Sequence, residues 1–195
     1  MILQSVAVAL SVIFDLFILT ALVRFWMQVV RAPSRNPMAQ FSMALTDWGV
    51  KPLRRVVPGL FRLDLASLIL ALAVEFVLQL VVTVMFGNSP IDDPTLLPWV
   101  LFVSFVELLR LTVYIFMGAI IIDAVLSWVS PHHPVRPFFD AFTRPLLRPL
   151  RSVVPLVGGV DITPLFALLI FQLVLMPLVS WLELNGLRAL GRGLL

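Results

Sequence analysis

The chain has 195 residues, of which 61% are hydrophobic and 13% charged, and its formal net charge is +3. Soluble domains are about 45–50% apolar and about 25% charged, so this composition excludes a small soluble domain that buries its apolar side chains in one core. The chain contains no cysteine, which excludes disulfides, thiolate catalysis and cysteine-ligated metal centres.

Four long apolar runs follow one another along the chain and predict four membrane-spanning helices. The predicted spans cover residues 2–23, 64–86, 97–129 and 161–184. A helix rises about 1.5 Å per residue, so the first span reaches about 33 Å, enough for the hydrocarbon core of a bilayer. The third span lies in an apolar run of 34 residues, about 51 Å long as one helix. We expect it to tilt, to kink or to emerge from the membrane.

The loop between the first two spans occurs a second time between the last two. Residues 36–68 align without a gap on residues 133–165, and 12 of the 33 aligned positions are identical. Internal repeats of this kind indicate two copies of one structural unit. We predict a structural role for six repeated residues: Pro52, Pro58, Asp64, Pro149, Pro155 and Asp161.

The repeat divides the chain into two parallel halves. The first repeat covers residues 1–88, the second covers 96–185, and a short tail follows at 186–195. Each half is a hairpin with its loop on the same side, so we expect the hairpins to pack about a pseudo-twofold axis along the membrane normal.

Basic residues predict the orientation, because loops rich in Lys and Arg stay in the cytoplasm. The two repeat loops, taken as residues 31–62 and 130–160, carry ten Lys or Arg residues, whereas the connection at 87–95 carries none and has two Asp. We therefore expect cytoplasmic repeat loops. Arg188 and Arg192 in the tail oppose this orientation, and a tail folded back along the membrane is the alternative that stays open.

The first loop is expected to form an amphipathic helix in the headgroup layer of the membrane. Four apolar residues follow the spacing of one helical face: Phe41, Ala44, Leu45 and Trp48. The second loop continues the pattern with Phe138, Ala141 and Phe142. There we expect Pro145 and Pro149 to break the helix into short turns, because an internal proline removes a backbone hydrogen bond.

Basic residues at the ends of both segments form the candidate docking surface for a partner or for lipid. They are Lys51, Arg54, Arg55, Arg144, Arg148 and Arg151. Each Lys or Arg near anionic lipid contributes about 1 kcal/mol to binding. The competing interpretation is a plain connection between two spans, in which these residues only set the topology.

Four ionisable residues are expected near the middle of the membrane, where charge is costly and often functional. They are Asp15, Glu75, Glu107 and Arg110. We expect the stripe that contains Glu75, and the stripe from Glu107 to Gly118, to face the protein interior. One interpretation is a proton or cation site. The other, which we favour, is structural: Glu107 pairs with Arg110, and the other acids are neutral and hydrogen-bonded between helices.

Other kinds of site find little support in the sequence. His132 and His133 are adjacent in a proline-flanked loop with few acids nearby, which makes a poor ligand set for a metal. Phosphate-binding loops, Ser-His-Asp sets and dinucleotide fingerprints are absent. We therefore expect no enzymatic activity, no metal and no cofactor.

The motifs of the two loops are specific. The first copy has Lys-Pro-Leu-Arg-Arg-Val-Val-Pro-Gly at 51–59 and Asp-Leu-Ala-Ser at 64–67, and the second has Pro-Leu-Arg-Ser-Val-Val-Pro at 149–155 and Asp-Ile-Thr-Pro at 161–164. These motifs resemble the YggT family of small integral membrane proteins, over nearly the whole chain. The resemblance implies a bacterial inner-membrane protein. Relatives are associated with osmotic stress tolerance, with cell division or shape, and with cytochrome assembly in chloroplasts.

The sequence thus predicts an all-α membrane protein with four transmembrane helices in two parallel tandem hairpin repeats, each with an amphipathic interfacial cytoplasmic segment. With the resemblance, the expected function is a non-enzymatic scaffold or assembly factor of the bacterial inner membrane, linked to osmotic stress tolerance. The alternative is a small ion or proton transporter or channel component that uses the mid-membrane acids. The expected partners are anionic lipid headgroups and another membrane protein or a second copy of the chain, but not nucleic acid.

Overall fold

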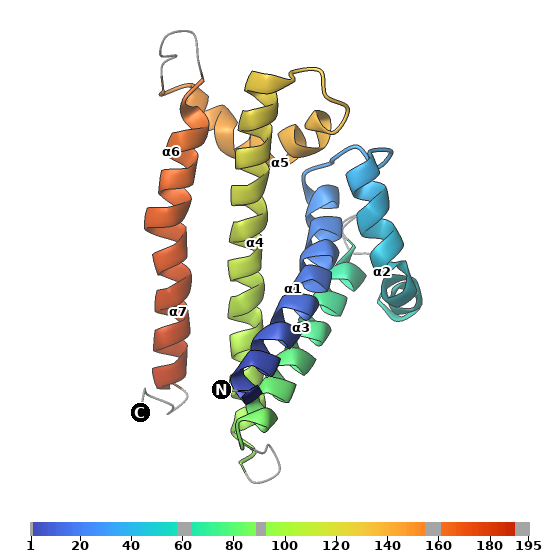
Figure 1. Ribbon diagram of the computed structural model, residues 1–195, viewed down its shortest axis with the longest axis vertical. Helices are drawn as coiled ribbons and strands as arrows, with labels where there is room; N and C mark the ends of the chain where they lie inside the picture. Colours follow the sequence, from blue (N-terminus) through green and yellow to red (C-terminus); the bar gives the residue numbers. More distant parts are fainter. Residues whose placement is uncertain (1, 58–63, 89–92, 155–160, 190–195) are drawn as a thin grey trace.

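The computed structural model describes residues 2–57, 64–88, 93–154 and 161–189, the last four by their backbone alone. In chain order the elements are α1 (Ile2–Val29), α2 (Pro37–Val56), α3 (Leu65–Met85), α4 (Leu96–Val129), α5 (Arg136–Arg151), α6 (Thr163–Ile170), η1 (Phe171–Leu175) and α7 (Met176–Ala189). The π-helical turn η1 joins α6 and α7 into one rod (Figure 1). This described part of the chain contains no strand.

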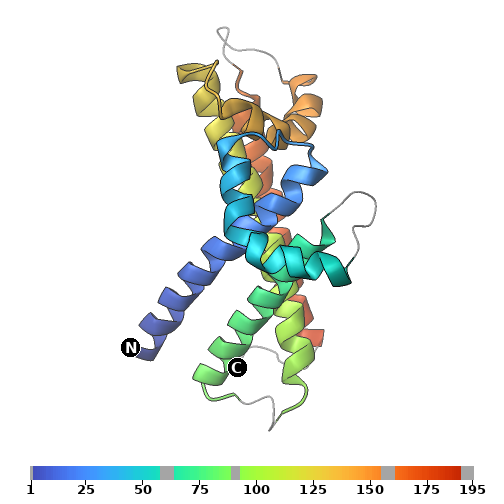
Figure 2. The same ribbon diagram turned by 90° about the vertical axis from the view of Figure 1, so that its right-hand side faces the viewer.

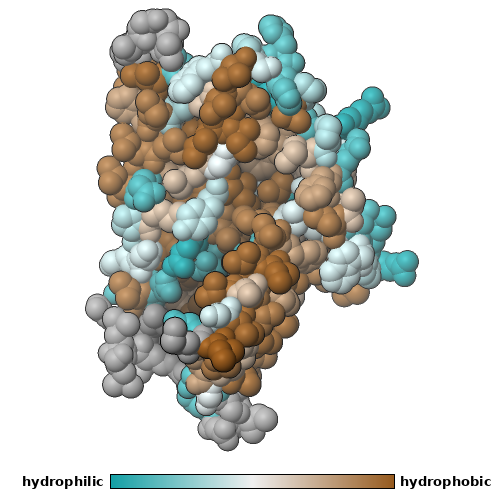
Figure 3. All heavy atoms as spheres, viewed as in Figure 1, coloured by the Kyte–Doolittle hydropathy of each residue, from teal (hydrophilic) through white to brown (hydrophobic). Residues whose placement is uncertain are grey.

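Four helices in the described ranges are long and apolar enough to cross a membrane: α1, α3, α4 and the rod over Thr163–Asn185. They confirm the four predicted spans. Large apolar side chains are exposed along all of them, among them Val12, Val77, Phe105 and Leu173, and brown spheres cover most of the face shown in Figure 3. Soluble monomers rarely expose so much apolar surface, so the fold is that of an all-α membrane protein.

Two helices extend beyond the predicted ends of their spans. α1 continues past residue 23 to Val29, because Arg24 finds buried polar partners within the protein. α7 runs to Ala189, so the predicted tail begins as helix, and Arg192 lies outside the described residues. The third span is one helix of 34 residues, and its C-terminal end extends well past the neighbouring ends of α1 and α3 (Figure 1).

The expectation that prolines break the second loop helix is wrong. α5 is one helix of 16 residues with Pro145 and Pro149 inside it. Each internal proline costs about 3 kcal/mol, whereas each fully buried Leu or Phe side chain contributes about 1.5–3 kcal/mol. The α5 side chains of Phe138, Phe142 and Leu147 are buried. The free energy of burying them is therefore large enough to offset the cost of the two prolines.

α4 is the central element, because it contacts both halves of the molecule. It packs against α1 and α3 in the first repeat and against α5, α6 and α7 in the second. Leu108 of α4 lies in one core cluster with Ile18 and Leu22, and Val113 of α4 lies in another with Phe171. In Figure 1, α1 and α3 are inclined to α4, whereas the α6–α7 rod runs beside it.

Direct contacts join the two repeats into one structure. The indole N–H of Trp26 donates to Thr112 Oγ1 (3.2 Å), and the side-chain amide of Asn36 donates to the carbonyl of Pro134 (3.0 Å). A core cluster also brings Met27 of α1 together with residues of α4 and α5. The first loop is therefore positioned partly by the second.

α2 folds back beside α1 and α3, and its second half turns away from its first (Figures 1 and 2). Its start is capped by Asn36, whose side chain accepts a hydrogen bond from the N–H of Met38 (3.1 Å). Pro52 lies within the turned half and removes one helical hydrogen bond. Gly49 faces α3, and a Cβ there would lie only 2.9 Å from the Leu70 side chain, so the glycine permits this close approach.

Candidate functional site

The same arginine–aspartate pair occurs in both repeats and ties the end of each loop helix to the start of the next span. Arg54, near the end of α2, donates two hydrogen bonds to Asp64, the residue before α3. Arg151, the last residue of α5, donates to Asp161 (2.8 Å). The partners are ten residues apart in each repeat. Arg54 and Arg151 therefore have an internal partner, although the sequence placed them on the docking surface.

The pair in the first repeat belongs to a larger buried cluster. The Asp64 side chain is 3% exposed and also accepts a hydrogen bond from Ser67 (2.7 Å), and Arg24 Nε lies 3.4 Å from it. The Asp161 side chain is 25% exposed, and it also accepts a hydrogen bond from the backbone N–H of Thr163 (2.9 Å). The same pair is thus a buried junction in one repeat and a half-exposed one in the other.

Both aspartates are held in the ionised form. Burial raises the pKa of Asp64, but hydrogen bonds from Arg54 and Ser67 and the charges of Arg54 and Arg24 outweigh it, so the pKa lies below its ordinary value. The balance at Asp161 is similar, since Thr163 and Arg151 together lower its pKa against burial. Each junction is therefore a charged pair at neutral pH.

Arg24 anchors α2 on α1. Its side chain is 3% exposed and donates hydrogen bonds to Thr46 Oγ1 and Asp47 Oδ1, both at 2.8 Å. Hydrogen bonds from Lys51 and Arg24 hold the pKa of Asp47 below its ordinary value. Sequence reasoning missed this anchor because Arg24 and Asp47 are 23 residues apart and neither is identical in the second repeat.

In the second repeat, the span residue that anchors the loop helix is an acid, Asp123, where the first repeat uses Arg24. Thr143, which aligns with Thr46, donates a hydrogen bond to Asp123 of α4 (3.0 Å), and Arg136 Nε lies 3.7 Å from the same carboxylate. Asp123 contacts the loop helix of its own repeat.

The two loop helices use their matching apolar faces differently. In α5, Phe138 is 3% exposed and Phe142 is 1% exposed, because both pack into the core of the chain. In α2, the aligned residues Phe41 and Leu45 are 56% and 41% exposed, and Trp48 is 69% exposed. The interior side of α2 instead holds small and polar residues such as Thr46. The apolar face of α2 is therefore largely exposed, although the Trp48 ring packs against Phe17 of α1 with ring centroids 5.6 Å apart.

An apolar groove adjoins this face of α2. It has a volume of about 350 Å³, and we call it the α2–α4 groove; its lining includes Met38, Phe41, Tyr114, Gly118 and Phe138. Apart from Gly118 itself, its two chain neighbours and the adjacent backbone of α4, no atom of the described chain lies within 4 Å of the position that a Cβ on Gly118 would take. Tyr114 is exposed, so the stripe from Glu107 to Gly118 faces this groove in part, and the expectation that all of it faces the interior is wrong.

The remaining candidate docking residues differ in how free they are. Lys51 pairs with Asp47 (2.8 Å) one turn away, and Arg144 pairs with Asp140 in the same manner. Arg55 and Arg148 are exposed, and within the described residues neither side chain forms a hydrogen bond or an ion pair. Exposed pairs of this kind contribute little to stability, so all four side chains remain accessible to a ligand.

Arg110 lies between two acids in the spans. Its guanidinium donates to Glu107 (2.6 Å), as expected, and also to Glu183 of α7. Figure 3 shows hydrophilic spheres between α4 and the rod, within an otherwise apolar face. Sequence reasoning missed Glu183 because its position at the end of the predicted fourth span gave no indication of a mid-membrane partner.

Glu75 is fully buried in α3, and Thr83 in the same stripe is buried with it. Its Oε1 accepts a hydrogen bond from Gln79 of the same helix (2.8 Å), which corrects the expected bond between helices. Its Oε2 has no hydrogen-bond partner among the described residues, and the group interacts electrostatically with Asp15 and Glu107. Gln172 aligns with Glu75 but is exposed, so the second repeat has no matching buried group.

The other predicted site residues can be placed only in part. Pro52 and Pro149 lie inside loop helices, whereas Pro58 and Pro155 lie outside the described residues. His132 and His133 are exposed just before α5. In the part of the chain that the structure describes, no group of three or more His, Cys, Asp or Glu residues is arranged to hold a metal ion.

Comparison with known proteins settles the family. The family described as CCB3/YggT matches residues 3–85 and 102–182. The chain belongs to the CCB3/YggT family. An uncharacterised protein of Pseudomonas aeruginosa is 34% identical to it over 179 residues, which is 90% of this chain and 86% of the relative. YggT of Escherichia coli K12 is 29% identical over 178 residues, 91% of this chain and 90% of the relative. No solved structure matches the chain.

The family match includes the residues that build the junctions of this YggT-family chain. Arg54 and Asp64 lie in its first matched segment, and Arg151 and Asp161 lie in its second. The named relatives are described as uncharacterised. The functional argument therefore depends on the surfaces of this chain.

Proposed function

We propose that this YggT-family chain is a non-enzymatic scaffold of the bacterial inner membrane that holds a helix of another membrane protein in the α2–α4 groove. One observation carries the proposal: the repeats use matching faces for different purposes. The chain itself buries the apolar face of α5, whereas the matching face of α2 stays largely exposed beside an open groove, with only Trp48 leaning on Phe17 of α1. A duplicated element whose second copy is used internally leaves its first copy available for an external contact.

The groove favours a helix over lipid as its occupant. Association of helices inside a membrane depends on close packing at small residues, and the open space beside Gly118 gives such a site. Phe41 and Trp48 form the exposed face beside it, followed by Arg55. Aromatic residues, Met and Arg are the types enriched in protein interfaces. Lipid alone requires none of these features.

We place both repeat loops in the cytoplasm. The support is the ten Lys and Arg residues of these loops against none in the connection at 87–95. In this orientation the α2 face lies towards the cytoplasmic side, where its basic end meets anionic lipid. α7 extends to Ala189 at the end of the rod opposite α5 (Figure 1), so Arg188 in this last turn opposes the orientation. The ten basic residues of the loops outnumber the two arginines of the tail.

The substitution Gly118→Leu tests the scaffold, because it fills the groove without an internal clash. We expect the variant to insert and melt as the parent does, since no other part of the chain lies within 4 Å of the Cβ position at Gly118 and the groove beside it is open. Overpacking of a contact costs about 1–3 kcal/mol, so recovery of a copurifying membrane protein in mild detergent should fall about tenfold. Growth in high salt, in cells that lack their own copy, should fall with it.

Ala73→Leu is the matched control, because it adds the same side chain at an exposed position of α3. It should retain both the partner and growth in high salt. Equal losses from the two variants, or parental behaviour of Gly118→Leu, would reject the scaffold. If the species lost is a second copy of the chain, the groove is a self-association site and the scaffold proposal fails.

A small proton or cation transporter is the second candidate, and the buried Glu75 is the observation that favours it. Its Oε2 lacks a hydrogen-bond partner among the described residues, and Asp15 and Glu107 interact with it, while Arg110 is engaged by Glu107 and Glu183. Neither of the two pockets described here is lined by these acids, which weighs against a continuous path. A flux into proteoliposomes that Glu75→Gln abolishes would support this candidate, and no flux from well-folded parent protein would end it.

A further inference from the structure

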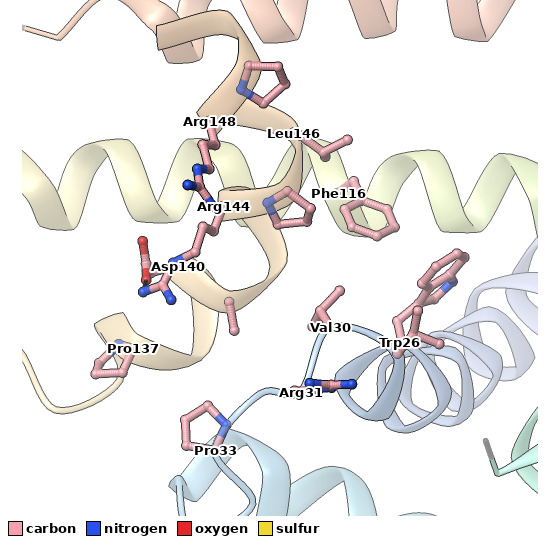
Figure 4. A pocket seen from close by; sticks show the side chains of 14 residues that line it. Trp26, Val30, Arg31, Pro33, Phe116, Pro137, Asp140, Arg144, Leu146 and Arg148 are labelled. Carbon is pink, nitrogen blue, oxygen red and sulfur yellow. Dashed lines mark hydrogen bonds and ion pairs between the residues drawn. The ribbon is translucent and has the colours of Figure 1, made fainter. Parts of the chain in front are cut away.

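A second and larger cavity lies between α1, α4 and α5, away from the α2–α4 groove. Its volume is about 960 Å³, which is at the upper end of the range of small-molecule sites, about 300–1,000 Å³. Figure 4 shows Trp26 and Val30 on one side, Phe116 of α4 behind them and Leu146 of α5 opposite. The walls are therefore mainly apolar, and we call this cavity the α1–α5 cavity.

Positively charged side chains line the α1–α5 cavity from two elements, with Arg31 at the end of α1 and Arg144 and Arg148 on α5 (Figure 4). The one acidic lining residue, Asp140, pairs with Arg144. The side chains of Arg31 and Arg148 form no hydrogen bond or ion pair within the described residues, and both residues are exposed. Two guanidinium groups are thus available beside an apolar cavity, in the arrangement that an amphipathic anion requires.

The backbone of Arg31 gives an independent reason to regard this residue as placed for binding. The N–H of Ala32 donates to Met27 O (2.8 Å) and the N–H of Arg31 donates to Gln28 O (3.2 Å), which is the hydrogen-bond pattern of a Schellman motif. Arg31 occupies the left-handed position of this motif with φ 55°, where glycine is preferred because a side chain is strained there. The chain therefore keeps an arginine at the cavity at a cost in backbone strain.

We infer that the α1–α5 cavity binds one anionic glycerophospholipid, with its headgroup between Arg31 on the α1 side and Arg148 on the α5 side and part of an acyl chain between Trp26 and Phe116. The cavity lies where the apolar α1 gives way to the polar loop, which is the depth of headgroups in a bilayer. Basic pockets between transmembrane helices are suited to such headgroups. The inference goes beyond the proposed scaffold and stands if that proposal fails, because it uses a different surface.

The test is lipid binding by the purified full-length chain in mild detergent, with Arg31→Gly as the informative variant. Dioleoyl phosphatidylglycerol is titrated against dioleoyl phosphatidylcholine, and adducts retained in native mass spectrometry give the affinities. Each arginine near an anionic lipid should account for about a fivefold change. Arg31→Gly and Arg148→Gln should each weaken phosphatidylglycerol binding about fivefold, and the double variant more than tenfold.

Three comparisons make the test decisive. Arg31→Gly should melt at the same or a higher temperature, because glycine relieves the strain at φ 55°, so a loss of binding cannot come from unfolding. Arg35→Gln removes an equally exposed arginine that does not line the cavity and is not part of the docking surface, and it should leave binding unchanged. Equal losses from Arg35→Gln, equal affinity for phosphatidylcholine, or full competition by inorganic phosphate would each overturn a lipid site.

Discussion

Asp64 and Asp161 occupy the same position in the two repeats, but their surroundings differ. Asp64 is held by Arg54, Ser67 and Arg24 in a buried cluster, and Asp161 is held by Arg151 near the surface. Loss of one partner from a buried pair costs about 3–5 kcal/mol, whereas an exposed pair contributes about 0.2–1 kcal/mol. The same change at these two positions should therefore have very different effects.

We predict that Asp64→Asn lowers the melting temperature in detergent by much more than Asp161→Asn does. Asn keeps the size of the side chain but not its charge, so Arg24 and Arg54 lose a counter-charge in the first repeat. Differential scanning fluorimetry at pH 7 makes the comparison, and the second substitution is the internal control. Similar shifts at the two positions would show that burial does not decide the strength of the junction.

The pH dependence of stability follows from the same pairs. The pKa of Asp64 is lowered in the folded state, and the ordinary value is about 3.9. Such a group adds stability that is fully present above the unfolded pKa and is lost as the pH falls through the folded pKa. Melting temperatures measured from pH 7 to pH 3 should therefore fall below about pH 4, and Asp64→Asn should reduce this fall.

At the scale of whole elements, the apolar spans were predictable because lipid imposes a length on any helix that crosses it. The loop helices were predictable only in part. The spacing of Phe138 and Phe142 indicated one helical face, and both are indeed buried together. The local rule for proline failed at Pro145 and Pro149, since tertiary packing outweighs the loss of backbone hydrogen bonds there.

The faces of α2 and α5 show what a repeat in sequence leaves undetermined. Phe41 and Phe138 are identical and aligned, yet one is exposed and the other is buried. Their difference comes from the neighbouring elements, since α5 packs on α4 and the rod, while α2 packs on α1 and α3. The local sequence pattern does not specify which elements, distant in the chain, will pack against a helix. This is why the free face could not be assigned from the sequence.

For the molecule as a whole, the absence of cysteine makes the orientation directly measurable. Ser34 lies in the first loop and Asn88 in the connection after α3, and both are exposed. In intact bacterial cells, a membrane-impermeant maleimide should label Asn88→Cys and should not label Ser34→Cys. Both should react after the cells are opened, which controls for accessibility. The reverse pattern would put the repeat loops outside.

The charged residues beside the two anchoring threonines, Thr46 and Thr143, affect which span each loop helix docks on during assembly. On the first span the residue that meets the loop helix is Arg24, and on the third it is Asp123; beside the threonines, Asp47 in one loop aligns with Arg144 in the other. If α2 docked on α4, Asp47 would approach Asp123, and α5 on α1 would bring Arg144 to Arg24. Like charges in such a site are costly. The two hairpins therefore carry opposite charges at this contact, which favours docking of each loop helix on the span of its own repeat.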